Sequence, residues 1–566
     1  KTSKELIISR LIGPAPKKQF LIISLQNKRN NIRVNKIMLV LIPSAGVGSR
    51  LDYHTQHFNK AMIQIGDVPV ISHIIEAYPK NTEFIIMLGY KGDHIKQYLN
   101  LTYGNKKFIF IEVKNFNGLG SGLTLTLKKA LPLIDRPFFF HANDTIIKDK
   151  NFYKNIKRNT MFLHNGPADS MRFATVELKK QINHKLNHYI KNCYNYTGLA
   201  YVKDYQLFKK IIKDSHNNFG ELSYFKNIQF NNIDFKFVKY WHDIGSHDTK
   251  TLAEKTFRKR NILPKSDQGI FFKNNKVIKF FINPKTIIKR YKRSIILKDF
   301  VPKILNKKSF FYVYRFERGT IFSKLTNKKL EFKKLLDYLN KSFWIKKKLN
   351  KTKKYLFNKL CYYFYYEKTQ SRINVLYEKN NVRDEKDIIN NIQLPSLDNL
   401  LKKIDWKKIN DGVPSNFHGD LHFENIIFNG VRRKYTLLDW RDDFSGILDY
   451  GDLYYDLAKL NHGLIIDHNI VSEEKYNIQI NKNNINLDFY FSKDNSNCQK
   501  ILTNFLIKQK LSIYKINILT ALIFLNIAGL HHYPYSIFLY YLGKAHLNES
   551  LKRKNSKKII CIKKKK

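Results

Sequence analysis

Residues 38–51 read MLVLIPSAGVGSRL, an apolar run that ends in a turn containing two glycines. Such a run is typical of a strand buried on both faces, as in a parallel sheet. Gly46 and Gly48 let backbone N–H groups approach a phosphate chain closely, and Arg50 places a cation beside them. The stretch therefore predicts a strand followed by a phosphate-binding loop.

Beyond this loop, apolar runs alternate with amphipathic segments. Strands are expected over 84–90, 107–113 and 137–144, and helices over 70–78, 93–100 and 123–131. This alternation predicts an α/β unit, a doubly wound and mainly parallel sheet covered on both faces. Ligands of such sheets bind at the carboxyl ends of the strands.

Charged residues stand at several of those ends. Lys60 follows Arg50 by ten residues and supplies a second cation. Asp144 ends the strand PFFFHAND, where it is either a Mg²⁺ ligand beside a triphosphate or a helix N-cap. Asp243, in YWHDIG, is either a second carboxylate ligand or a turn residue.

These motifs resemble those of the sugar-nucleotide pyrophosphorylase, or NTP-transferase, family over residues 38–252. The family's glycine-rich loop ends in an arginine–leucine pair, here Arg50-Leu51, and its later lysine matches Lys60. Two departures are Ser44, in place of alanine or glycine, and Asn59, in place of proline. The resemblance assigns metal binding to Asp144 and Asp243, and nucleotide binding to Ala45, Gly46, Gly48, Ser49, Gly120 and Ser121.

The resemblance also implies a reaction. A phosphate monoester attacks the α-phosphorus of an NTP, CTP or UTP, and pyrophosphate leaves. Arg50 and Lys60 act as catalytic cations that stabilise developing charge, with Mg²⁺ on Asp144.

The pattern changes after Lys250. Residues 269–282 alternate apolar and polar positions around Asn274-Asn275, which predicts a β-hairpin. Lys279 on its second strand either pairs with ATP phosphates or faces solvent. A strand near 309–318 leads to Gly319, a predicted hinge, and helices are expected over about 328–410.

The segment HGDLHFEN, residues 418–425, is followed by an apolar run that ends in Asp439-Trp440-Arg441. In phosphoryl transfer an acid orients or deprotonates the acceptor hydroxyl, while an amide and a second acid hold Mg²⁺. Asp420 is the candidate catalytic base, and Asn425 and Asp439 are the candidate metal ligands.

These residues resemble the aminoglycoside phosphotransferase/choline kinase family over residues 269–547. The resemblance implies a two-lobed, protein-kinase-like α+β fold, with Lys279 as the nucleotide lysine. Gly269 is the only glycine near the expected glycine-rich loop. Downstream, Asp449, Asp452 and Asp456 either cage a cationic amine together with tyrosines, or, for Asp456, cap or brace a helix.

The expected organisation is a basic extension (1–37), a nucleotidyltransferase domain (38–255), a kinase-like domain (260–550) and a basic tail (551–566). Met38 directly precedes the first strand and is a candidate translation start. The four cysteines show no paired spacing, which indicates a reducing cytoplasm, and the apolar run 516–530 is too short to span a membrane.

The net charge of +55 suggests either binding to nucleic acid or membrane, or an AT-rich codon bias that enriches lysine along the whole chain. No nucleic-acid-binding motif is present. The leading hypothesis is a cytoplasmic bifunctional enzyme. It phosphorylates a small hydroxyl compound, an amino alcohol such as choline or a sugar, with ATP. It then couples the phosphomonoester to an NMP, giving a cell-surface glycan or capsule precursor. The alternatives are a nucleotidyltransferase joined to a regulatory or unrelated kinase, or a basic binding protein with a degenerate nucleotide fold. The oligomeric state is left open.

Overall fold

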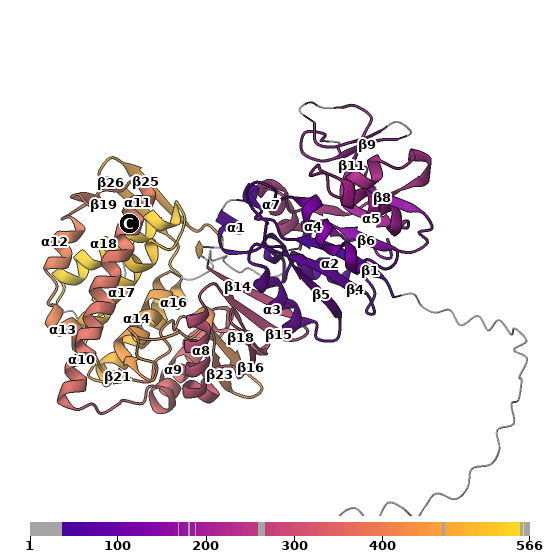
Figure 1. Cartoon of the computed structure of the whole chain (residues 1–566). Helices are drawn as coiled ribbons and strands as arrows, with labels where there is room; N and C mark the ends of the chain where they lie inside the picture. Colours follow the sequence, from indigo (N-terminus) through magenta and orange to yellow (C-terminus); the bar gives the residue numbers. More distant parts are fainter. Residues whose placement is uncertain are drawn as a thin grey trace, which may run out of the picture.

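The computed structural model of the chain describes residues 37–559, apart from 52, 168, 179–180, 187, 189, 258–266, 467–469, 472 and 555–557. Nearly all of the extension expected over 1–37 and most of the tail expected over 551–566 lie outside the described residues. We call residues 37–257 the N-terminal part and residues 267–559 the C-terminal part (Figure 1).

The N-terminal part contains a nine-stranded sheet within its described residues. Its centre is the parallel set β6-β1-β4-β5, in which β1 pairs with both β4 and β6. The helices and strands predicted between residues 38 and 144 are all present. Their bounds are β1 (Leu39–Ser44), α2 (Val70–Glu76), β4 (Glu83–Leu88), α3 (Gly92–Thr102), β5 (Lys107–Glu112), α4 (Leu123–Ala130) and β6 (Phe138–His141).

The sheet is mixed rather than mainly parallel, which corrects the prediction. β11 runs antiparallel to β6, β8 and β9. An apolar run indicates a buried strand but carries no information about its direction, so the pattern could not reveal this reversal. The remaining elements are β7 (Thr145–Ile147), β8 (Asn159–His164), β9 (Thr175–Glu177), β10 (Gln181–Asn183), β11 (Tyr194–Val202), α5 (Tyr205–Asp214), α6 (Leu222–Lys226), β12 (Ile233–Val238), β13 (Trp241–Asp243) and α7 (His247–Phe257).

The two faces of β1 bury different side chains, as strand alternation requires. Val40 and Ile42 join the core that includes α2 and α3, whereas Leu39 and Leu41 join the core that includes α4 and α5. Helices therefore cover both faces of the central sheet, as predicted.

The C-terminal part begins with the predicted hairpin. Asn274 and Asn275 have φ values of 48° and 57°, which suit a two-residue turn between strands. The small sheet has the order β14-β15-β17-β16. Its elements are β14 (Gln268–Lys273), β15 (Lys276–Phe281), α8 (Pro284–Leu297), β16 (Ile304–Lys307) and β17 (Phe311–Arg315).

Helices dominate the rest of the C-terminal part, as predicted for 328–410. A short hairpin, β19 (Asp387–Ile389) with β20 (Ile392–Leu394), interrupts that stretch. Strand β19 also pairs with β26 (Asn484–Phe489), a contact distant in sequence that local helical patterns do not reveal. No described helix is both long and apolar enough to cross a membrane. Other elements are α9 (Lys328–Tyr338), α10 (Lys351–Tyr362), α11 (Lys368–Asn380), α12 (Leu397–Lys402), α13 (Trp406–Asn410), β22 (Ile426–Asn429), β23 (Lys434–Leu437), α14 (Leu453–Ile465), β25 (Tyr476–Asn481), α16 (Lys493–Lys508), α17 (Ile513–Ala528), which is the buried helix expected near 516–530, and α18 (Tyr535–Lys552).

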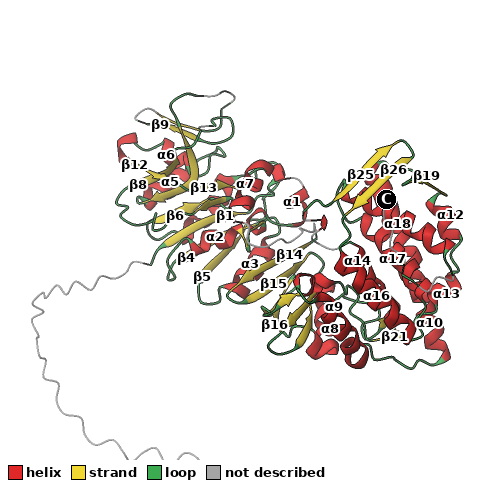
Figure 2. Ribbon diagram, turned by 180° about the vertical axis from the view of Figure 1, so that it is seen from behind, coloured by secondary structure: helices red, strands yellow, loops and turns green. Residues whose placement is uncertain are grey.

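The small sheet is shared between two cores. Phe281 of β15 packs with the C-terminal helices, while Ile278 and Phe280 pack into the N-terminal core. The ring of Phe280 lies 4.8 Å from the rings of both Phe58 and His94. Figures 1 and 2 show β14 and β15 beside α3, so the two parts meet through a buried aromatic contact.

Candidate active sites

Lys60 meets Asp144 at the carboxyl end of the N-terminal sheet. Lys60 is only 8% exposed, and its ammonium pairs with the Asp144 carboxylate. Asp144 precedes the strand β7, so it caps no helix. Burial works to raise the pKa of Asp144, but the charge and hydrogen bond of Lys60, together with the charge of Arg50, hold it below its usual range. We call Arg50, Lys60, Asp144 and Asp243 the N-terminal site.

Asn59, which stands where the family resemblance expects proline, fixes the turn that carries Lys60. Its side-chain amide donates to the backbone oxygens of Ser44 at 3.0 Å and Tyr90 at 2.7 Å, and its Oδ1 accepts from the Ala61 N–H at 2.9 Å. Ser44 ends β1 and Tyr90 follows β4. The Asn59 amide therefore ties the lysine turn to two central strands.

Asp243 lies beside Asp144. Strand β13 pairs antiparallel with β7 and aligns Asp243 with Thr145, the neighbour of Asp144. Burial, followed by the negative charge of Asp144, raises the pKa of Asp243. Its Oδ2 accepts from Arg172 Nη2 and from Thr249 Oγ1, each at 3.2 Å. Two partly buried carboxylates that repel each other form a suitable place for a divalent cation.

Three charged residues near this site escaped the sequence analysis. They are Arg172, which contacts the second carboxylate, Lys185 and Glu221. Burial, followed by the charge of Arg50, lowers the pKa of Lys185. Burial, with a contribution from the charge of Asp144, raises the pKa of Glu221 to about 8. All three come from segments beyond β8, and no sequence spacing connects them to the glycine loop.

The residues predicted to bind nucleotide in the N-terminal part follow β1 and β5. Gly48 has a φ of +73°, and a Cβ there would lie 3.1 Å from Thr55 and 3.4 Å from Lys60, so a larger residue would be strained and crowded. Gly46 has no atom within 4 Å of the position of a Cβ. The first loop carries Ala45, Gly46, Gly48 and Ser49, and the second carries Gly120 and Ser121.

Lys279 and Asp439 meet in the C-terminal part. Lys279 is 7% exposed, and its Nζ lies 2.9 Å from Asp439 Oδ2, so the solvent-facing alternative is wrong. The other Asp439 oxygen accepts from Arg290 Nη1 at 2.9 Å. Asp439 has a φ of +60°, a conformation rare outside glycine and enriched at functional turns. We call Lys279, Asp420, Asn425 and Asp439 the C-terminal site.

Helix α8 supplies two arginines that the sequence analysis missed. Arg290 donates to the Asp439 carboxylate. Arg293 is 1% exposed, and its guanidinium donates to the backbone oxygens of Leu448, at 3.0 Å, and of Phe417. The helix contains no acidic residue. Protein kinases pair a lysine with a glutamate of a small-lobe helix. In this chain Lys279 pairs with Asp439.

Asp420 lies among polar partners beside β22. Lys459 of α14 places its Nζ 2.8 Å from Asp420 Oδ1. The Asn425 amide donates to the Asp420 backbone oxygen at 2.9 Å, and His422 Nε2 lies 3.7 Å from Asp420 Oδ2. Lys459 was not predicted, because it stands 39 residues after Asp420 on a helix that tertiary packing brings alongside.

Asp456 of α14 holds the HGD loop in place, and Asp452 is the N-cap of this helix. Both are engaged within the protein, so neither is available for the expected amine cage. Asp456 is fully buried and accepts from the backbone N–H groups of His418 and Gly419, each at 2.7 Å. Burial raises its pKa to about 6. Asp452, also fully buried, pairs with Lys515 at 3.0 Å. Asp456 thus braces the HGD loop, whereas the alternative expected from the sequence is that it caps or braces a helix.

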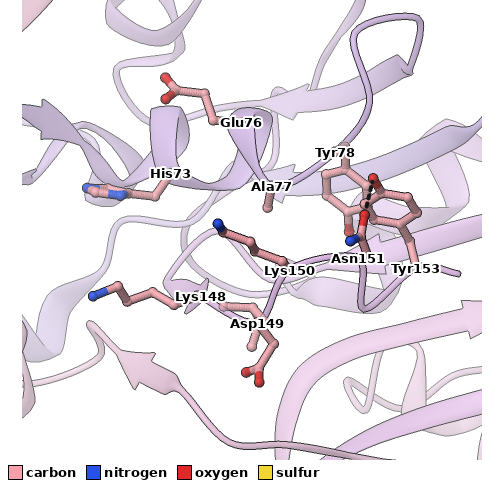
Figure 3. A pocket seen from close by; sticks show the side chains of 10 residues that line it. His73, Glu76, Ala77, Tyr78, Lys148, Asp149, Lys150, Asn151 and Tyr153 are labelled. Atoms are coloured by element: carbon pink, nitrogen blue, oxygen red, sulfur yellow. Dashed lines mark hydrogen bonds between the residues drawn. The ribbon is translucent and has the colours of Figure 1, made fainter.

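Figure 3 shows a pocket between α2 and the segment that follows β7. Its lining includes His73, Lys148 and Tyr153, and none of the candidate site residues. It lies at the far end of β7 from Asp144. Among the residues that the structure describes, no group of three or more His, Cys, Asp or Glu side chains could hold a metal ion. The N-terminal site offers two carboxylates, and Mg²⁺ is commonly held by one or two together with substrate phosphates.

No family model matches the chain. The chain is 38% identical over 63 residues to a probable glucose-1-phosphate cytidylyltransferase of Bacillus subtilis, a match that covers 11% of this chain and 25% of that protein. It is 24% identical over 425 residues to the protein Ycf2 of Physcomitrium patens, covering 68% of this chain and 17% of that protein. The chain thus spans a quarter or less of the length of these two relatives.

Solved structures that match part of the chain include a putative glucose-1-phosphate thymidylyltransferase from Bacillus anthracis. It is 19% identical, with a TM-score of 0.33, and the match covers 40% of this chain and 98% of that one. A CTP:phosphocholine cytidylyltransferase from Streptococcus pneumoniae is 17% identical, with a TM-score of 0.33 and coverage of 39% and 100%.

Proposed function

We propose that the chain is a bifunctional enzyme. Its N-terminal part transfers a nucleotidyl group from CTP or UTP to a phosphomonoester, and its C-terminal part makes that phosphomonoester from a small hydroxyl compound and ATP. The shared intermediate makes the two reactions consecutive. The product is a nucleotide-linked precursor of the kind used for cell-surface glycans.

The observation that carries the first activity is the grouping of Lys60, Asp144 and Asp243 at the carboxyl end of a central strand. In the reaction, a phosphomonoester oxygen forms a bond to the α-phosphorus of the NTP, and the bond to the β,γ-diphosphate breaks, releasing pyrophosphate. Lys60 and Arg50 favour the negative charge that develops on the phosphates. The 63-residue similarity to a probable cytidylyltransferase supports this assignment.

Mg²⁺ fits the N-terminal site, because Asp144 and Asp243 are neighbouring carboxylates whose mutual repulsion a cation would relieve. Asp144 and Asp243 would hold the ion there, and Asp439 with Asn425 would hold it in the C-terminal site. When bound, Mg²⁺ neutralises phosphate charge.

The second activity is supported by two contacts, that of Lys279 with Asp439 and that of Asn425 with the Asp420 backbone. The acceptor oxygen forms a bond to the γ-phosphorus of ATP, its proton passes to the Asp420 carboxylate, and ADP leaves. Lys459 keeps Asp420 oriented through the 2.8 Å contact. The absence of a glutamate from α8 is a departure from the protein-kinase arrangement.

A reciprocal experiment tests the proposal. Pyrophosphate release and ADP formation are measured on the full chain with Mg²⁺, each NTP and a panel of choline, ethanolamine and common sugars with their phosphates. Asp420→Asn should abolish ADP formation and leave pyrophosphate release from an added phosphomonoester intact. Lys60→Ala should do the reverse.

Loss of both activities in either folded variant would contradict two independent sites. Salt-sensitive retention on DNA with no NTP turnover would instead favour the basic binding protein suggested by the charge of +55.

A further inference from the structure

Four cationic side chains lie within electrostatic range of one another, and one of them contacts Asp420. The proposed kinase reaction leaves the other three without a role. All four come from three segments distant in sequence: α11, the turn after Asp439, and α14. The four are Lys368, Arg372, Arg441 and Lys459, which we call the cation cluster.

Arg441 and Lys459 place the cluster next to the HGD loop. Arg441 packs on Gly419, since a Cβ at Gly419 would lie 2.6 Å from the Arg441 Cβ. The Arg441 N–H bonds to the His418 oxygen at 2.9 Å. Lys459 reaches Asp420 directly at 2.8 Å. Two of the four cations thus contact the loop that carries the candidate base.

A single phenylalanine ring links the other cations to this group. The Phe364 ring centroid lies 4.5 Å from Lys368 Nζ and 4.8 Å from the Arg441 guanidinium carbon. Arg372 stands four residues after Lys368 on α11, on the same helix face. Burial, followed by the charges of Arg441 and Arg372, lowers the pKa of Lys368 well below its usual value.

The cluster has few negative partners among the described residues. Asp420 forms an ion pair with Lys459. The charge of Asp442 raises the pKa of Lys368, and the charge of Asp267 raises that of Arg372, but in each case burial and neighbouring cations outweigh it. The Arg441 Nε–H is buried and bonds to no described group. An anion bound among these side chains would offset their repulsion and give the Arg441 Nε–H an acceptor.

We infer that the hydroxyl compound phosphorylated at Asp420 is an anion, a sugar acid or a sugar phosphate, whose carboxylate or phosphate is held by Lys368, Arg372 and Arg441. This inference rests on the proposed kinase function. Among the acceptors left open above it favours anions over choline and ethanolamine, because Asp452 and Asp456 are already paired within the protein.

Matched acceptors that differ in charge test the inference. ADP formation by the full chain is measured with glucose, glucuronate, glucose 6-phosphate and choline, and with the same series built on galactose and mannose. We expect an anionic member to be phosphorylated with a KM about tenfold below that of its neutral parent, and choline to be inert. The carboxylate and phosphate arms separate the two sources of charge.

Substitutions identify the residues responsible. Lys368→Gln and Arg372→Gln should each raise the KM for the anionic acceptor about tenfold while leaving kcat and the KM for ATP within twofold. Lys379→Gln, an exposed lysine of the same helix, is the matched control and should change nothing. Inorganic phosphate titrated by calorimetry gives a readout that needs no turnover, and the Lys368→Gln/Arg372→Gln double variant should lose one binding site.

The failures are distinguishable. Phosphorylation of a neutral or cationic acceptor as efficiently as the anionic ones, or a change confined to the KM for ATP, would overturn the inference and leave the kinase. An unchanged phosphate titration in the double variant would also overturn it. If no acceptor is phosphorylated while the double variant still loses a phosphate site, the kinase proposal fails and an anion site remains.

Discussion

The N-terminal and C-terminal sites both contain a buried lysine–aspartate pair, but the elements that supply the surrounding residues differ. In each, a buried lysine pairs with the aspartate predicted to hold metal: Lys60 with Asp144, and Lys279 with Asp439. The N-terminal aspartate has a second carboxylate beside it, Asp243. The C-terminal aspartate has a second cation instead, from α8.

This difference has a structural origin. In the N-terminal site, Lys60 and Asp144 follow β1 and β6, which are neighbouring parallel strands, and the pairing of β13 with β7 adds Asp243. The C-terminal site joins a small sheet, a helix and two loops of the large helical region, and it depends on the packing between them. The comparison implies that local changes should silence each site separately, whereas packing changes should affect the C-terminal site more.

The largest effect is expected from removing one charge at each metal position. Asp144→Asn should lower pyrophosphate release about a thousandfold, and Asp439→Asn should lower ADP formation by a similar factor, because each removes the carboxylate beside the reacting phosphates. Each variant serves as the control for the other, and the unaffected activity should stay within twofold. If either variant lost pyrophosphate release and ADP formation equally, the two sites would not be independent.

Asp456→Ala should destabilise the C-terminal part by about 4 kcal/mol, because it leaves the buried N–H groups of the HGD loop without an acceptor. Denaturant unfolding followed by tryptophan fluorescence measures the loss. Asp449→Ala, at an exposed position nearby, should stay within about 0.5 kcal/mol. A small effect at Asp456 would mean that the loop is held mainly by Arg293.

Phe280→Ala should cost about 3 kcal/mol, since it opens a cavity where the small sheet packs against Phe58 and His94. The same substitution sharpens the comparison, because strand β15 also carries Lys279. We expect the KM for ATP to rise while pyrophosphate release changes little. Leu305→Ala, at an exposed site on β16, is the control. A larger loss at the N-terminal site would reverse the dependence proposed here.

The smallest effect concerns pH. The folded pKa of Glu221, about 8, lies above its ordinary value of 4.5, so its contribution to stability is complete below pH 4.5 and is lost as pH rises through 8. Glu221→Gln should therefore be more stable than the native chain by about 2 kcal/mol at pH 9 and nearly equal at pH 4. Thermal unfolding across this range measures it.

Glu112→Gln, at an exposed position on β5, is the matched control for this pH dependence and should leave the curve unchanged. A native chain whose stability is flat between pH 5 and 9 would contradict the burial of an ionisable Glu221.

Local pattern predicted much of the N-terminal architecture, because an apolar strand run and a glycine turn identify themselves within a dozen residues. It also placed Lys279 on the correct strand, yet could not choose between its two environments. The local pattern could not predict strand direction. It also could not predict the role of Asp456, because the sequence around an aspartate does not show whether it braces a loop or binds a ligand. Arg172, Arg290 and Lys459 left no local signal.

The sequence by itself determined the strand-and-loop order around Gly46, the hairpin around Asn274, and the acid–amide–acid spacing of Asp420, Asn425 and Asp439. Each depends on neighbours along the chain. Tertiary structure alone decided which lysine meets which aspartate, and which cations surround Asp420. Those contacts join residues up to 160 positions apart, as Lys279 and Asp439 are, and only the packing of the cores brings such residues within a few ångströms.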